Sequence, residues 1–283
     1  MAASSTVAPP AGRSAFDGAA AMTTLRGMDE FIRPRPVGYA GSLAEAPAEK
    51  LAFLRKVYGL FTGSLFMAFL GAMVALYMGA DMSRASVTIG REAFIVPPLV
   101  AWFTNHYIIG ILIFFGAFFG ASTVRERPGI NVAALFGATF VSGLYIAPVL
   151  WYVQAAASQG LTLATSPIRD AFLLAVLGFT GLSTYALLSK RDFSFLGGFL
   201  SMGLWVLIGA SLLGMFVGGS AFSLAIASVG ILLFGGYILF DTSRMLRDPT
   251  NRDAVGAAIG LYLNFLNLFL FLLRILASGR RDS

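Results

Sequence analysis

The 283-residue sequence contains no cysteine and a single histidine, which excludes disulfide bonds, thiolate metal sites and histidine metal clusters. Charged residues are also scarce. They make up 12% of the chain, whereas a soluble globular protein carries about 25%. Hydrophobic residues reach 57%, and the mean hydropathy is +0.79. These values indicate a polytopic membrane protein.

Catalytic and nucleotide-binding motifs are missing as well. There is no phosphate loop, no metal-hydrolase motif and no nucleotide site. A serine–histidine intramembrane protease would need a base at the depth of Ser142, but His106 lies at the outer side of its span. The usual Gly-x-Ser-Gly run is also absent, because residue 140 is Phe. We therefore expect neither an enzyme nor a bound cofactor.

Long apolar runs occupy most of the remaining sequence. A helix needs about 20 mainly apolar residues to cross a bilayer. Seven segments reach this length, at residues 57–80, 99–122, 130–153, 170–188, 195–217, 222–240 and 255–276. The sequence thus predicts an all-α integral membrane protein with seven transmembrane helices, in which Pro148 kinks the third. We expect a disordered cytoplasmic N-terminal tail at residues 1–50, a membrane domain at 51–277 and a short C-terminal tail at 278–283.

The net charge of +6 does not indicate a nucleic acid partner, because the basic residues are spread over loops and tails. The N-terminal tail and the even-numbered loops carry 14 Lys and Arg residues, against 6 on the other side when Arg274 is counted there. Because Lys and Arg are retained in the cytoplasm, we expect the N-terminus there. Seven spans then place the C-terminus outside. Arg280 and Arg281 favour the inside, which one re-entrant span would allow.

A few polar side chains interrupt the last two spans. Asp241 ends the sixth, and Asn264, Asn267 and Arg274 lie within the seventh. At about 100° per residue, Asn267 and Arg274 lie about 60° and 80° from Asn264, on one helix face. Polar groups cost several kcal/mol in hydrocarbon unless partnered, so this face should meet protein or trapped water. Asp241 is either a functional acid or a cap that solvates the helix end.

The loop between the second and third spans places Arg125 and Arg127 on the same side as Asp241. Either arginine could reach that acid, or both could be ordinary charges of the cytoplasmic side. Elsewhere, Gly116–Gly120 and Gly214–Gly218 have the spacing that lets helix backbones approach closely. We interpret these glycines as packing within the chain rather than as a dimer interface.

The last two spans carry recognisable runs of residues. They are YILFDT at 237–242, LYLNFLNLF at 261–269 and LLRIL at 272–276, together with FVSG at 140–143 and the loop SKRDFS at 189–194. In these runs the chain resembles the Bax inhibitor-1 (transmembrane Bax inhibitor motif) family in its bacterial form, over residues 51–277. The resemblance implies seven helices with the last one central, wrapped by the other six, in a bacterial inner (plasma) membrane.

The resemblance also implies a pH-sensitive calcium leak. In that scheme two acids, one from each of the last two helices, share a proton and bond an arginine from the end of the second helix. The first acid corresponds to Asp241 and the arginine to Arg125. The second acid corresponds to Asn264, which is a departure, because an amide does not titrate. Asn267 and Arg274 complete the supporting polar face.

The substitution at Asn264 changes what we expect of this site. Calcium prefers several oxygen ligands and negative charge, so Asp241 and Asn264 should bind it weakly, and the response to pH should be blunted. The first hypothesis is therefore a calcium leak channel with a weakened switch, with the lipid bilayer and calcium or another cation as partners.

A second hypothesis is a non-transporting modulator of membrane proteases or membrane-protein quality control, which the long N-terminal tail would suit. Its partner would be a membrane protease. A small-molecule transporter is disfavoured, because neither paired broken helices nor an inverted repeat is evident.

Overall fold

A computed structural model describes residues 47–80, 83, 85–189, 191–247 and 253–278. The predicted N-terminal tail therefore lies almost wholly outside the described residues, as do Arg280 and Arg281. The described elements are α2 (Pro47–Tyr77), β1 (Ser86–Ile89), β2 (Glu92–Ile95), α3 (Pro98–Asn105), α4 (Tyr107–Thr123), α5 (Ile130–Ser158), α6 (Pro167–Leu188), α7 (Leu196–Val217), α8 (Ser220–Arg247) and α9 (Ala254–Leu276).

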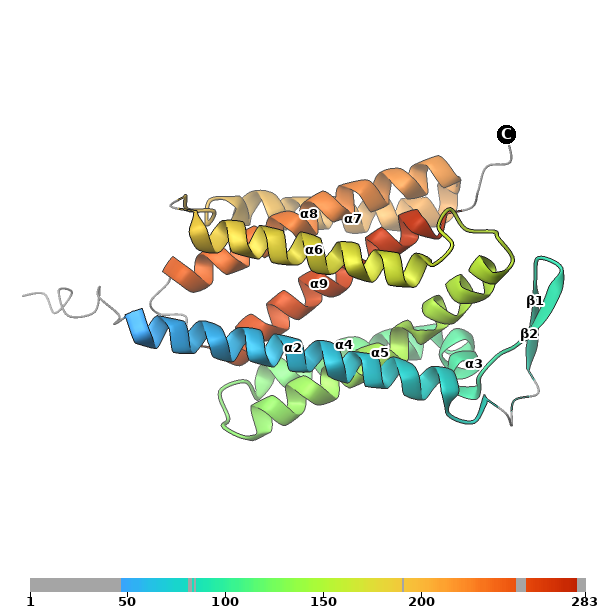
Figure 1. Ribbon diagram of the computed structural model, residues 1–283, viewed down its shortest axis with the longest axis horizontal. Coiled ribbons are helices and arrows are strands. Elements are labelled where there is room, and N and C mark those ends of the chain that lie inside the picture. The colour runs from blue at the N-terminus through green and yellow to red at the C-terminus, as the bar shows by residue number, and fades with distance from the viewer. Residues whose placement is uncertain (1–46, 81–82, 84, 190, 248–252, 279–283) are drawn as a thin grey trace, which may run out of the picture. The chain divides into compact units, whose positions relative to one another are not determined.

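Six of these helices, α2 and α5 to α9, are long and apolar enough to cross a membrane, and α3 with α4 makes a seventh candidate. This confirms the predicted class, an all-α membrane protein. Figure 1 shows α2, α4 and α5 on one side and α6, α7 and α8 on the other, with α9 running between them. Half of the apolar window of α9 is buried, the largest share among the spans, whereas α7 is 11% buried and packs on α8.

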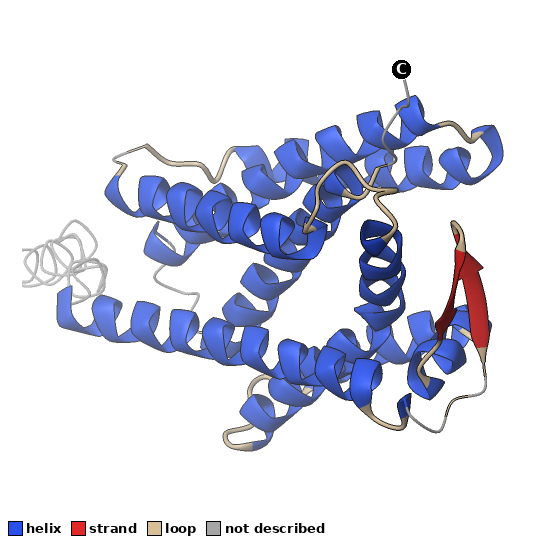
Figure 2. Ribbon diagram, turned by 45° about the vertical axis from the view of Figure 1, so that its right-hand side comes forward, coloured by secondary structure: helices blue, strands red, loops and turns tan. Residues whose placement is uncertain are grey.

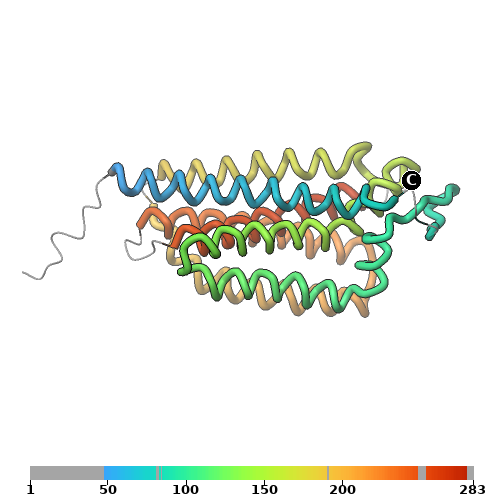
Figure 3. The backbone as a smooth tube through the Cα atoms, turned by 90° about the horizontal axis from the view of Figure 1, so that it is seen from below, coloured from blue at the N-terminus to red at the C-terminus, as the bar shows by residue number. Residues whose placement is uncertain are grey.

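The second predicted span is not one straight helix. The chain breaks at His106, and α3 and α4 meet at 96°. His106 has φ −120° and ψ 44°, outside the helical region. Its ring nitrogen Nδ1 bonds the carbonyl oxygen of Trp102 at 3.0 Å, and such side-chain bonds compete with helical ones. Figure 3 shows α4 returning the chain to the end of the bundle at which α2 begins.

A short antiparallel hairpin precedes α3, where the sequence analysis identified no strand. Ser86 pairs with Ile95, and Ile89 pairs with Glu92. Gly90 opens the turn with φ +65°, a conformation that favours glycine. Figure 2 shows this hairpin beside the end of the helical bundle. Its Ile89 is buried against Ala155 and Ala156 of α5.

The first long helix contact joins α2 to α5 through glycine. A Cβ atom at Gly143 would lie 2.0 Å from the carbonyl oxygen of Ala68, and one at Gly71 would lie 2.1 Å from that of Phe140. The two backbones therefore touch directly, which only glycine permits. Further along α5, Figure 1 shows the helix changing direction. The second half of α5 contains Pro148, whose ring removes a backbone donor.

The glycines singled out by spacing do not make such contacts. A Cβ atom at Gly116, Gly120 or Gly218 would meet no described atom within 4 Å, and the nearest atoms to one at Gly214 belong to the side chains of Ile226 and Phe222. The prediction that Gly116–Gly120 packs within the chain is wrong, because both residues lie on the outward face of α4.

Candidate functional site

The two residues at the centre of the predicted site are in contact. Asn264 donates a hydrogen bond from Nδ2 to Oδ2 of Asp241, with a distance of 2.6 Å between them. Asn264 is 7% exposed, and Asp241 is partly buried. The bond joins α8 to the middle of α9 within the apolar part of the bundle. A polar pair at that depth is stabilised by its own bond, because there is little water to replace it.

A glycine makes room for this carboxylate. Gly260 lies one turn before Asn264 on α9, and a Cβ atom there would stand 3.3 Å from Oδ2 of Asp241. One oxygen of the carboxylate therefore approaches the α9 backbone at Gly260. The positive charge of Arg244, three residues further along α8, also acts on Asp241. The next residue, Thr242, is buried, and its hydroxyl lies 3.5 Å from that of Ser183 on α6.

The predicted contact between Asp241 and Arg125 is not the one that the structure forms. Arg125 pairs instead with Asp253, with 3.3 Å between Nε and Oδ2, and its side chain is half exposed. Asp253 caps the start of α9 by accepting a bond from the Gly256 amide at 2.8 Å. At 1.5 Å per residue, Asp253 precedes Asn264 by about 16 Å along the helix, so Arg125 pairs beyond the helix end and not at the buried pair.

The other two residues of the predicted polar face have separate partners. Asn267 donates from Nδ2 to the carbonyl oxygen of Leu263, one turn back on its own helix, at 2.7 Å. Arg274 donates from Nε to the hydroxyl of Ser223 on α8 at 2.8 Å. Asn264 and Arg274 thus both face α8, whereas the side chain of Asn267 is hydrogen-bonded within its own helix. The structure does not bring these two residues together with Asp241.

A second buried polar contact lies deeper in the bundle. The hydroxyl of Ser142 on α5 is hydrogen-bonded to that of Tyr262 on α9 and donates to the carbonyl oxygen of Thr139 at 2.7 Å. The ring of Tyr262 stacks on that of Phe118 with centroids 5.8 Å apart. The partner of Ser142 is thus a tyrosine. Sequence reasoning missed Tyr262, although a tyrosine two residues before Asn264 in an apolar run was a visible signal.

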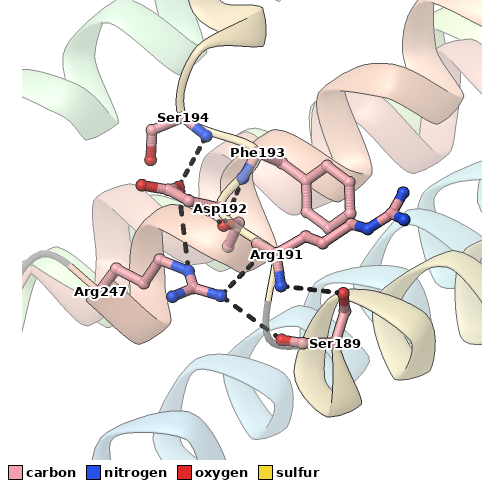
Figure 4. Close-up of polar contacts among 7 residues, drawn as sticks. Ser189, Arg191, Asp192, Phe193, Ser194 and Arg247 are labelled. Carbon is pink, nitrogen blue, oxygen red and sulfur yellow. Dashed lines mark hydrogen bonds and ion pairs between the residues drawn. The ribbon is translucent and has the colours of Figure 1, made fainter.

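The loop between α6 and α7 is held to the end of α8 by Arg247, as Figure 4 shows. Arg247 donates from Nη2 to the carbonyl oxygens of Arg191 at 2.6 Å and Ser189 at 3.4 Å. Its Nε stands 3.8 Å from Oδ1 of Asp192. Three groups of one loop therefore contact a single guanidinium, a role that was not expected of any residue from the sequence.

The carboxylate of Asp192 organises the same loop. Oδ1 accepts from the backbone amide of Ser194 at 2.9 Å and from the hydroxyl of Ser243 at 3.4 Å, and that hydroxyl accepts from the Phe193 amide at 3.1 Å. The hydrogen bonds from Ser194 hold the pKa of Asp192 below its ordinary value, and the charge of Arg247 acts in the same direction. Ser243 and Arg247 thus fix this loop to α8, two and six residues after Asp241.

The oxygen atoms near Asp241 limit what the pair can bind. Within the described ranges, no group of three His, Cys, Asp or Glu side chains could hold a metal ion. The carboxylate of Asp241 and the amide oxygen of Asn264 offer at most three side-chain oxygens, whereas calcium takes about 6–8. A calcium ion passing this pair would need water or backbone oxygens for most of its ligands.

Comparison with known proteins identifies one family model and several relatives that cover most of the chain. Residues 50–281 match the family model described as "Inhibitor of apoptosis-promoting Bax1". An uncharacterized membrane protein of Vibrio cholerae is 34% identical over 83% of this chain and 93% of its own length. The Golgi anti-apoptotic protein of vaccinia virus (strain Lister) is 33% identical, over 84% and 90%. Protein lifeguard 4 of Mus musculus is 31% identical over the same two shares.

Proposed function

Because the chain belongs to the Bax inhibitor-1 family of membrane proteins, we propose that it is a calcium leak protein in which the pH switch is fixed in one state. The proposal places it in a bacterial inner membrane with its N-terminus in the cytoplasm, which the excess of Lys and Arg at that end supports. The ion is the transported substrate and not a resident cofactor.

The observation that carries the proposal is the bond from Asn264 to Asp241 at 2.6 Å. Two neighbouring carboxyl groups can share one proton, and losing that proton leaves two like charges that repel. The amide of Asn264 donates the bond that a protonated carboxyl group would donate in such a pair. An amide keeps its hydrogens at every physiological pH. The contact between α8 and α9 therefore persists where a pair of acids would separate.

The position of Arg125 supports the same conclusion. In the scheme that the resemblance implies, an arginine compensates the charge of the acid pair. Here Arg125 pairs with Asp253 at the start of α9, and the amide of Asn264 donates a hydrogen bond to the Asp241 carboxylate. The bond between Asp241 and α9 then comes from a neutral donor, and a single substitution at Asn264 can change its response to pH.

The test is calcium flux into liposomes that contain the purified protein, measured from pH 5 to pH 8 with a trapped calcium dye. The wild type should give a low and nearly flat flux–pH curve. Asn264→Asp should give a curve that titrates near neutral pH, because it restores two acids in contact. Asn267→Asp is the matched control. It adds the same acid one turn away, where the side chain bonds Leu263 of its own helix, and its curve should stay flat.

Identical curves for the wild type and Asn264→Asp, with measurable flux in both, would contradict the fixed switch. No flux from any of the three proteins would favour the second candidate, a modulator of membrane proteases that transports nothing. One observation favours that candidate: both Asp241 and Arg125 already have partners within the chain. Crosslinking in cells that captured a membrane protease would then support it.

A further inference from the structure

A cavity of about 490 Å³ lies among α2, α5, α6 and α9. It is separate from the pair of Asp241 and Asn264, neither of which lines it. Its inner wall is formed by buried apolar side chains, among them Ile146, Leu150 and Phe269. Its rim includes Phe69 of α2 and Phe172 of α6, which are 57% and 45% exposed. The cavity is thus closed toward the centre of the bundle and open between two helices that face lipid.

Tyr262 also lines this cavity, but its hydroxyl is hydrogen-bonded to Ser142, and the other polar residues of the lining gather at one end. Gln154 near the end of α5, Ser166 just before α6 and Arg169 in the first turn of α6 all belong to the region where α5 connects to α6. Ends of spanning helices lie at the membrane surface, and their middles lie at hydrocarbon depth. The cavity therefore has an apolar body within the membrane and a polar end with one cationic side chain at its surface.

We propose that this cavity binds a long-chain fatty acid, with the alkyl chain among the four helices and the carboxylate at Arg169. Ligand pockets measure about 300–1,000 Å³, and a volume in the lower part of that range suits one alkyl chain better than the two of a phospholipid. A guanidinium presents five donors. A carboxylate is the complementary head group, because it accepts charge-assisted hydrogen bonds from that fork.

The carboxylate of Asp170 would compete with a bound fatty acid for the guanidinium of Arg169. Oδ1 of Asp170 lies 2.9 Å from Nη2 of Arg169 and 3.0 Å from its Nε. A bound carboxylate would share the guanidinium with Asp170 at the cost of mutual repulsion. Removing the charge of Asp170 should therefore tighten binding, whereas removing that of Arg169 should weaken it. Opposite effects from adjacent residues are not expected of general damage to the fold.

The experiment measures binding of tritiated palmitate to the full chain in phosphatidylcholine nanodiscs, with empty nanodiscs subtracted. We expect about one palmitate per chain. Arg169→Gln should weaken binding about tenfold or more, which corresponds to the loss of a charge-assisted bond. Asp170→Asn should strengthen it a few-fold. Ile146→Phe, which fills the cavity from α5, should remove saturable binding. Arg91→Gln, in the turn of the hairpin, is the matched control for lost charge and should have no effect.

Palmitate bound equally by the wild type, Arg169→Gln and Ile146→Phe would overturn the proposal. So would hexadecanol competing as well as palmitate, since it has the chain without the acid. Displacement of palmitate by phosphatidylglycerol at equal potency would identify a phospholipid as the occupant and would also contradict it. If Ile146→Phe fails to fold, the opposite shifts expected of the two α6 variants still decide the result. Because binding is measured without flux, the outcome does not depend on the proposed leak activity.

Discussion

The α2–α5 pair and the α8–α9 pair are joined by different kinds of contact. Between α2 and α5, Gly71 and Gly143 bring the backbones together, and each glycine lies against a carbonyl oxygen of the other helix. Between α8 and α9, glycines receive side chains instead: Gly260 receives the carboxylate of Asp241, and Gly230 receives the ring of Phe271. A backbone contact has one geometry, whereas a side-chain contact can change with the chemistry of one residue.

This difference separates a fixed part of the protein from an adjustable one. Shifting α2 against α5 would need both backbones to move, because neither carbonyl oxygen can rotate away from its glycine. Between α8 and α9, the bond of Asp241 with Asn264 and that of Arg274 with Ser223 are each formed by side chains that one substitution can remove. The pair that carries the candidate site is therefore also the pair that one substitution can loosen. Four predictions test this contrast.

The largest effect is expected at the backbone contact. Gly143→Ala places a methyl group where the Ala68 carbonyl oxygen lies 2.0 Å away, so the free energy of unfolding should fall by about 3 kcal/mol or more. Denaturant or thermal unfolding in detergent measures it. Gly116→Ala is the control, because its new methyl group meets nothing within 4 Å. It should be neutral or stabilising by up to about 1 kcal/mol. Equal loss in both variants would contradict the backbone contact.

The next effect is expected at the buried polar pair. Asn264→Leu leaves the carboxylate of Asp241 without its 2.6 Å donor, and the unfolding free energy should fall by about 2–3 kcal/mol. Asn267→Leu loses only a bond to its own helix backbone and should cost less than about 1 kcal/mol. The same unfolding measurement compares the two variants. If they cost the same, the contact of α8 with α9 does not depend on this pair.

A smaller effect is expected where α9 begins. Arg125→Gln removes an ion pair that is half exposed on the arginine side, so it should cost less than about 1 kcal/mol, and the cost should fall with added salt. Asp253→Ala should cost about 1 kcal/mol more, because the Gly256 amide also loses its cap. A loss at Arg125 as large as that at Asn264 would show that the arginine acts on Asp241 after all.

The smallest effect concerns pH and the loop at the end of α8. The pKa of Asp192 is lowered by hydrogen bonds from Ser194 and by the charge of Arg247, so its ionised form stabilises the fold. This contribution is complete above the unfolded pKa, about 3.9, and is lost as the pH falls through the folded value. The stability difference between the wild type and Asp192→Asn should stay constant from pH 5 to pH 8 and narrow below pH 4. A stability difference that grew as the pH fell below 4 would contradict the lowered pKa of Asp192.

The sequence predicted the pair at the site but not its surroundings. Asp241 and Asn264 stand out because both are polar in apolar segments, and the resemblance set them on facing helices. The partner of Arg125 could not be read from the same pattern, because its choice between two acids depends on where the loop before α9 ends. Asp253 precedes an apolar run in the way of a helix cap, which was the available signal.

Glycine shows the limit of spacing as a guide. The four-residue spacing of Gly116 and Gly120 predicts a contact, yet both lie on an outward face. Gly71 and Gly143 do contact another backbone, although neither has a second glycine four positions away. Which face of a helix meets a neighbour is a tertiary property. The bend at His106 was missed for a related reason: apolar length indicates that a segment can cross a membrane, and not that it does so as one helix.

The contact between Gly71 and Gly143 also has a consequence for biosynthesis. The two residues are 72 positions apart, and a ribosome adds about 5–20 residues per second. The contact face of α2 must therefore wait about 4–14 s in the membrane before its partner has been made. Among the spans that the structure describes, α9 is made last and is the most buried. The bundle consequently receives its centre after the other described spans have been made.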